Sequence, residues 1–285
     1  MIKFLLLILI SLGSFSKKQM PVNNDFINFE NIKGVLKKDQ LEKTLTEKQK
    51  RAQIQKQKKK SKQMKLYGLP TQDDFWKIMI EHWLVKNITI LKWDFRKPDY
   101  GVDEYFTNFL RQTGEIGLKF NILYLNTPNI SHFAFPMGSN EYLFLVSVPF
   151  IKSLDLSKLE ISIMLLEDLL RVKNDYFINS FDSKLTSSLS GGSFYQKEFP
   201  SKNLKTLMTK IDEKVFEKGF SFQEQHKITK MMNNILISDT QNWQAYYRML
   251  SKIDELVKGN LMYKNYLKIY PSPELQMNWL NPTKN

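Results

Sequence analysis

Residues 160–175 are the most constraining segment of the sequence, because they combine a nearly continuous apolar stretch with three charged side chains near its centre. Apolar residues lie almost all the way round a helix of about 3.6 residues per turn, which predicts a helix buried inside a core. Glu167, Asp168 and Arg171 interrupt this helix near its centre. Because unpaired charge is costly to bury, we expect these residues either to pair with one another or to mark a functional site.

The order of the predicted elements indicates an α+β domain that is mostly helical and contains a small antiparallel sheet. Two amphipathic helices come first, and Thr71 can cap the earlier one. Three β-like runs separated by turn residues precede the buried helix, which Asp155 or Ser157 can cap. The predicted bounds are 73–85 and 102–112 for the first helices, 118–126, 131–136 and 141–150 for the strands, 174–202 for a loop-like segment, and 203–218, 222–250 and 252–267 for the last helices.

Cysteine is absent from the 285 residues, and the only histidines are His82, His132 and His226. The lack of cysteine excludes disulfides, thiolate zinc sites and a cysteine nucleophile. No two histidines are four residues apart, so the sequence contains no pair of imidazole ligands on successive turns of one helix.

Residues 1–16 have the pattern of a secretory signal peptide, with Lys3 before an apolar run from Phe4 to Leu12 and small residues after it. The run is short for a membrane span. We therefore expect an exported protein, periplasmic or secreted. Retention by an uncleaved N-terminal anchor and burial of this segment as an ordinary helix are the alternatives.

Residues 17–66 form a basic arm that carries most of the net charge of +13. Residues 33–66 hold 13 lysines and arginines against three acidic residues, and the lysine run comprises Lys56, Lys58, Lys59, Lys60 and Lys62. Few apolar residues interrupt it, which predicts a disordered segment or a solvated, frayed helix. Such an arm can act as a linker or contact an anionic membrane surface. Nucleic acid is disfavoured as a partner, because the run lacks aromatic residues that stack on bases.

Three sequence pieces share an order with a known family. They are the strand-like "HFAFPMG", with Phe133, Ala134, Pro136 and Gly138; the helix "LEISIMLLEDLLR"; and the C-terminal "YPSPELQMNW". This order resembles the zinc metallopeptidases of the HtpX and CAAX-prenyl-protease type. The resemblance implies that residues 67–285 form a minimal gluzincin-like metallopeptidase domain, in which a helix carrying a His-Glu-x-x-His motif binds zinc.

The residues at the positions that the resemblance assigns to zinc differ from the family pattern. Glu167 stands at the first histidine, Asp168 at the general-base glutamate and Arg171 at the second histidine. A shift of one residue keeps Glu167 as the base but places leucines at both histidine positions. The remaining departures are Ile235 at the third ligand, counted back from Asp239, and Tyr270 at the histidine before the closing proline. The resemblance therefore implies a domain that has lost its zinc and has no other cofactor.

The spacing of Glu167 and Arg171 predicts an ion pair, because residues i and i+4 face each other on a helix. The pair would lie where zinc would join the two turns. The alternative is an ordinary ion pair on an exposed edge of the helix.

These observations favour an exported, catalytically inactive metallopeptidase-like protein that binds a peptide or protein, or associates with the cell envelope. One alternative is an active metalloendopeptidase with an atypical ligand set, in which Glu167, Asp168 and Asp239 hold a hard cation. The other is an envelope-associated or nucleic-acid-associated structural protein that acts through its basic arm.

Overall fold

The computed structural model describes residues 51, 54–56, 72–93, 100–190 and 201–280. The chain divides into two compact units, Met1–Tyr67 and Gly68–Asn285. In the first unit the described residues, which include Lys56, are helical and exposed. The predicted signal peptide and Lys58, Lys59, Lys60 and Lys62 of the predicted arm lie outside the described residues.

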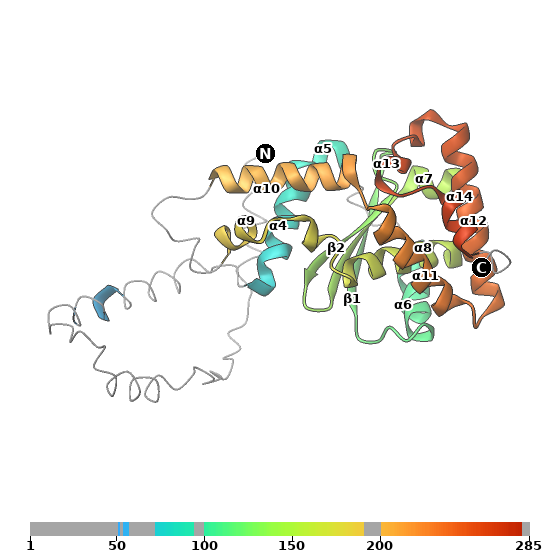
Figure 1. Ribbon diagram of the computed structural model, residues 1–285, viewed down its shortest axis with the longest axis horizontal. Helices are drawn as coiled ribbons and strands as arrows, with labels where there is room; N and C mark the ends of the chain where they lie inside the picture. Colours follow the sequence, from blue (N-terminus) through green and yellow to red (C-terminus); the bar gives the residue numbers. More distant parts are fainter. Residues whose placement is uncertain (1–50, 52–53, 57–71, 94–99, 191–200, 281–285) are drawn as a thin grey trace. The chain divides into compact units, whose positions relative to one another are not determined.

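The second unit is mostly helical, with one small sheet, so the predicted α+β class is confirmed (Figure 1). Its helices before the long buried segment are α4 (Gln72–Lys86), α5 (Ile88–Leu91), α6 (Val102–Gln112) and α7 (Val148–Ser153). From that segment onward they are α8 (Lys158–Lys173), η1 (Ile178–Ser180), α9 (Ser183–Ser188), α10 (Ser201–Glu213), η3 (Lys214–Lys218), α11 (Phe222–Leu236), α12 (Thr240–Gly259), η4 (Leu261–Tyr263), α13 (Tyr266–Ile269) and α14 (Pro273–Leu280). Among the described residues, no helix combines the length and apolar character needed to cross a bilayer.

The sheet contains β1 (Lys119–Leu125), β2 (His132–Gly138) and β3 (Glu141–Ser147) in the order β1-β3-β2. β2 and β3 form an antiparallel hairpin, whereas β1 pairs with β3 in parallel. The predicted antiparallel sheet is therefore wrong in one respect, because the sheet is mixed. The connection 126–131 carries the chain past the position of β3, so that β3 lies between β1 and β2 although it follows both in sequence.

Helix α8 lies at the centre of the second unit, between the sheet and helices α11 and α12 (Figure 1). It also packs against α6, and every residue from Glu160 to Val172 is buried. Burial on all sides accounts for its nearly uniform apolar sequence.

Several predicted helix bounds agree with the structure and two do not. The helix predicted at 102–112 is α6. The helix predicted at 252–267 is instead the end of α12 followed by η4 and the start of α13. The stretch predicted as one helix at 222–250 is divided between α11 and α12, because the helix ends at Leu236 and Asp239 caps a second helix. Its carboxylate accepts hydrogen bonds from the backbone N–H groups of Gln241 and Asn242 and thereby starts a new helix. The segment predicted as loop-like contains the short helices η1 and α9.

Candidate functional site

The start of α8 is fixed by a capping box between Ser157 and Glu160. Ser157 Oγ accepts a hydrogen bond from the Glu160 backbone N–H at 3.2 Å, and Glu160 Oε2 accepts one from the Ser157 backbone N–H at 2.8 Å. This arrangement satisfies N–H groups that a helix start leaves unpaired. Of the two predicted caps, Ser157 is therefore the one used, and the register of Glu167, Asp168 and Arg171 follows from it.

Arg171 lies between the two acidic side chains that precede it on α8. Its Nη2 donates to Glu167 Oε1 at 2.6 Å, and its Nη1 donates to Asp168 Oδ1. The predicted ion pair of Glu167 and Arg171 is therefore confirmed. The alternative of an exposed pair is wrong, because the two side chains are only 4% and 2% exposed.

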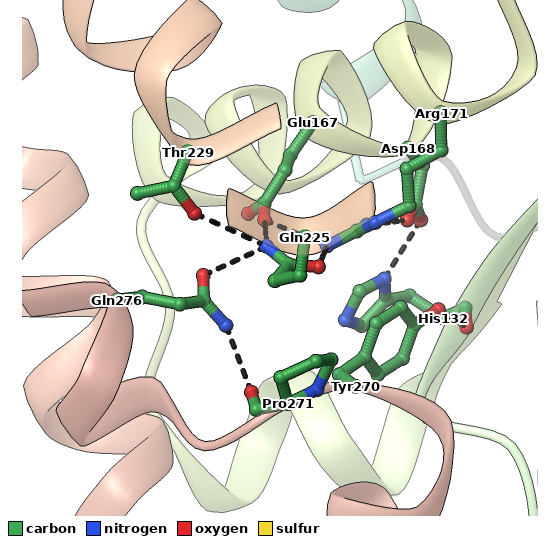
Figure 2. A network of polar contacts seen from close by, with 9 residues as sticks. All are labelled: His132, Glu167, Asp168, Arg171, Gln225, Thr229, Tyr270, Pro271 and Gln276. Atoms are coloured by element: carbon green, nitrogen blue, oxygen red, sulfur yellow. Dashed lines mark hydrogen bonds and ion pairs between the residues drawn. The ribbon is translucent and has the colours of Figure 1, made fainter. Parts of the chain in front are cut away.

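Gln225, on α11, closes this arrangement from the neighbouring helix (Figure 2). Its Oε1 accepts a hydrogen bond from Arg171 Nη2 at 2.8 Å, and its Nε2 donates to Glu167 Oε1 at 2.6 Å. The same amide donates to Gln276 Oε1 at 3.0 Å, and Gln276 donates to the Pro271 carbonyl at 3.0 Å. A chain of hydrogen bonds thus joins α8, α11 and α14.

His132, the first residue of β2, extends the network to the sheet (Figure 2). Its Nδ1 lies 2.7 Å from Asp168 Oδ2, and the nitrogen is the donor because an ionised carboxylate only accepts. Tyr270 Oη donates to the His132 carbonyl at 2.7 Å. The two rings are stacked, with centroids 4.4 Å apart and an angle of 12° between their planes.

Two aromatic rings cover the Arg171 guanidinium. Its central carbon lies 4.6 Å from the Tyr270 ring centroid and 5.2 Å from that of Phe220. Both distances lie within the range of cation–π attraction, which is stronger where water is excluded. We call His132, Glu167, Asp168, Arg171, Gln225, Tyr270 and Gln276 the buried network.

The electrostatics of the buried network keep Arg171 charged and Tyr270 neutral. Burial by itself lowers the pKa of Arg171, but the attraction of Glu167 and Asp168 outweighs burial, and the pKa is raised above its usual value. Burial, together with the negative charge of Asp168, raises the pKa of Tyr270 well above its usual value. The Tyr270 hydroxyl therefore remains a hydrogen-bond donor throughout the physiological pH range.

The buried network does not fit a zinc ion. Zinc takes neutral imidazole, thiolate or carboxylate ligands, whereas a guanidinium cannot lose its proton in a protein. Arg171 bonds to one oxygen of each carboxylate, and His132 bonds to the second oxygen of Asp168. In the part of the chain that the structure describes, no three histidine, aspartate or glutamate side chains are grouped as metal ligands.

The structure does not bring all of the sequence-predicted positions together. Tyr270 joins the buried network, but Ile235 and Asp239 do not. Ile235 lies ten residues after Gln225 on α11, which corresponds to about 15 Å along the helix axis. Asp239 is exposed and caps α12. On α11, Gln225 is therefore the residue that faces Glu167 and Arg171, in place of the predicted Ile235.

The four residues of the predicted strand motif belong to β2 and have structural roles. Phe133, Ala134 and Pro136 are buried in the strand. Gly138 has φ of 142° and lies at the irregularity in the pairing of β2 with β3. The motif thus forms the strand that presents His132 to Asp168.

His132, Gln225 and Gln276 are members of the site that the sequence analysis did not select. Gln225 shares one side of α11 with the buried residues Ile228 and Met232, at the spacing of an amphipathic stripe. A polar residue on an apolar stripe is the same signal that identified the charges of α8. The contacts of His132 join residues far apart in sequence and have no comparable local signal.

No protein-family model matches this sequence, and no curated protein matches it. The choice of a function therefore depends on the side chains of the site and on their surroundings.

Proposed function

We propose that this chain is an exported, catalytically inactive metallopeptidase-like protein that binds a peptide or protein partner in the cell envelope. The observation that carries the proposal is the position of Arg171, whose guanidinium joins Glu167 and Asp168 at the helix positions where the resembled peptidases hold zinc. A fixed positive charge there would link the turns of the helix without any metal.

The chemistry of the buried network supports a structural role for these residues. Metal-assisted hydrolysis needs a metal with an open coordination position and a water molecule beside a general base. Glu167 and Asp168 are instead paired with Arg171 and are almost fully buried. An active peptidase with Glu167, Asp168 and Asp239 as ligands loses support, because Asp239 caps α12 at the surface.

Burial of the network also limits where a partner can bind. Arg171, Gln225 and Tyr270 are each about 2% exposed or less. In this conformation a partner would contact the outer surface of the domain, while the network holds α8, α11, α14 and the sheet in one arrangement. We therefore propose that the partner binds at the surface of the domain, and that the buried network stabilises the arrangement of helices and sheet that forms this surface.

The first test is metal content and peptidase activity of the purified chain. We expect no stoichiometric zinc and no cleavage of unstructured peptide substrates, because the ligand positions hold Glu167 and Arg171. Elemental analysis and a chelator-sensitive peptide assay provide the measurement. About one zinc per chain together with chelator-sensitive cleavage, as expected for a catalytic zinc site, would refute the proposal.

A positive control can be built into the same chain. The combined change Glu167→His, Asp168→Glu, Arg171→His and Gln225→Glu supplies two imidazoles and a carboxylate from the neighbouring helix. If the domain descends from a zinc peptidase, this variant should bind zinc. A second variant keeps the three changes on α8 but carries Ile235→Glu in place of Gln225→Glu, and it should not bind zinc. Zinc titration of both variants, with circular dichroism as a check on folding, separates these outcomes.

A second test concerns the arm. Deleting residues 47–65 should change the melting temperature by less than about 2 °C, because a segment without an apolar face contributes little to stability. The described residues within this segment are all exposed, which agrees with that expectation. Thermal unfolding of the deleted and full chains provides the measurement. A large loss of stability would show that the arm belongs to the folded core.

A further inference from the structure

A short turn after α12 exposes more apolar surface than its surroundings. We call residues 261–268, which include η4 and the start of α13, the lysine-flanked turn. Leu261 is 86% exposed, Met262 61% and Leu267 45%. Among the described residues, Leu261 and Met262 are the one pair of consecutive large apolar side chains that are both exposed. Clustered exposure of this kind marks an interaction site more often than scattered single residues do.

The fold holds this turn in place, so that the exposure is built into the structure. Asn260 Oδ1 accepts a hydrogen bond from the Met262 backbone N–H at 3.0 Å. Tyr263 is buried, and its hydroxyl lies 3.2 Å from Ser153 Oγ. Tyr266 is buried as well. Tyr263 and Tyr266 are thus anchored inside, while Leu261 and Met262, which precede them, lie at the surface.

The charge around the turn has one sign. The sequence contains no acidic residue between Glu255 and Glu274. Lys264 and Lys268 are exposed and form no ion pair with any described residue. Lys258, by contrast, is neutralised by Asp254 and Glu274, at 2.7 and 2.9 Å. The exposed aliphatic side chains are therefore flanked by two uncompensated positive charges.

We propose that the lysine-flanked turn docks the domain on the surface of an anionic lipid bilayer. Leu261, Met262 and Leu267 would enter the boundary between headgroups and acyl chains, and Lys264 and Lys268 would meet the anionic headgroups. A protein partner is less well matched, because the residues that dominate protein interfaces are Trp, Tyr and Arg, and Leu is under-represented. This inference goes beyond the proposed function and holds whether or not the chain has lost peptidase activity.

The natural absence of cysteine allows a local test in the full chain. Leu261→Cys labelled with an environment-sensitive nitrobenzoxadiazole fluorophore reports on the turn. Ile116→Cys is the matched control, because Ile116 is 78% exposed at a distant position in the sequence. With vesicles of phosphatidylglycerol and phosphatidylcholine, we expect a blue shift and an intensity increase at position 261 only. Vesicles of phosphatidylcholine alone should give a much smaller change.

Cosedimentation with the same vesicles tests the side chains themselves. Leu261→Ser with Met262→Ser should lower partitioning about tenfold or more, since each buried aliphatic side chain contributes to membrane affinity. Lys264→Glu with Lys268→Glu should lower it on anionic vesicles, and Ile116→Ser should not change it. Circular dichroism confirms that each variant is folded.

Two outcomes would overturn the proposal. The label at position 261 could stay unchanged while the chain binds vesicles, which would assign binding to another segment such as the arm. The label could instead change with protein concentration in the absence of lipid, which would identify the turn as a contact between copies of the chain.

Discussion

Arg171→Met is expected to lower the free energy of unfolding by about 3–5 kcal/mol, the range for breaking a buried ion pair from one side. The change removes the charge and the donors but keeps an apolar side chain of similar length. Glu167 and Asp168 would then be carboxylates inside the core without their cation. Denaturant unfolding followed by circular dichroism measures the loss.

A matched control lies in the same domain. Asp254 and Lys258 form an ion pair with the same i, i+4 spacing, but Lys258 is 57% exposed. Lys258→Met should therefore have an effect close to the error of the measurement, because exposed pairs contribute little. Equal losses for Arg171→Met and Lys258→Met would show that the buried network contributes no more than a surface pair.

The double change Glu167→Gln with Arg171→Met should recover much of the loss. It removes one charge of each sign, and the new amide at position 167 can still hydrogen-bond to Gln225. Asp168 keeps its contact with His132. A double-mutant cycle should therefore show a coupling energy of about 1–3 kcal/mol between positions 167 and 171, as for residues of one network.

The part of this site that follows from local sequence could be predicted. The period of apolar residues identified α8, Ser157 was one of the two caps predicted for its start, and the spacing of Glu167 and Arg171 gave their ion pair. Each of these depends on neighbours within one or two helical turns, where the geometry of a helix is fixed. The burial of the pair agrees with the same pattern, since apolar residues surround it on the helix.

The part that depends on distant contacts could not be predicted. Gln225 donates to Glu167 from a helix 58 residues further along the chain, and Gln276, another 51 residues on, accepts from Gln225. The strand order β1-β3-β2 likewise depends on which edge of the hairpin receives β1, and strand composition does not specify this. The break at Asp239 did have a local signal, because an aspartate before Thr-Gln-Asn is a common helix start.

Gly219→Ala is expected to be the other severe substitution, with a loss of more than about 3 kcal/mol from backbone strain and steric overlap together. Gly219 has φ of 51° and ψ of −138°, a conformation that residues with a side chain rarely adopt. A Cβ at this position would lie 2.0 Å from the Ile269 carbonyl oxygen. Since that oxygen belongs to the backbone, the segment before Tyr270 would have to move.

Two other glycines separate strain from overlap. Gly117 has φ of 77°, but no atom lies within 4 Å of the place that a Cβ would take, so Gly117→Ala should show strain alone, at about 1 kcal/mol. Gly259 has neither a positive φ nor a close neighbour, so Gly259→Ala should be nearly neutral or stabilising. Thermal and denaturant unfolding of the three variants should therefore give a graded series.

The effect of Gly219→Ala should also be coupled to the buried network. Phe220, the next residue, donates its backbone N–H to the Ile269 carbonyl at 2.8 Å, and its ring, like that of Tyr270, covers Arg171. Displacing Ile269 would therefore shift both rings away from the guanidinium. In the double variant with Arg171→Met, part of this loss has already occurred, so the combined destabilisation should be smaller than the sum of the single effects. Strict additivity would show that Gly219 is needed only for the local backbone conformation and does not position the rings that enclose Arg171.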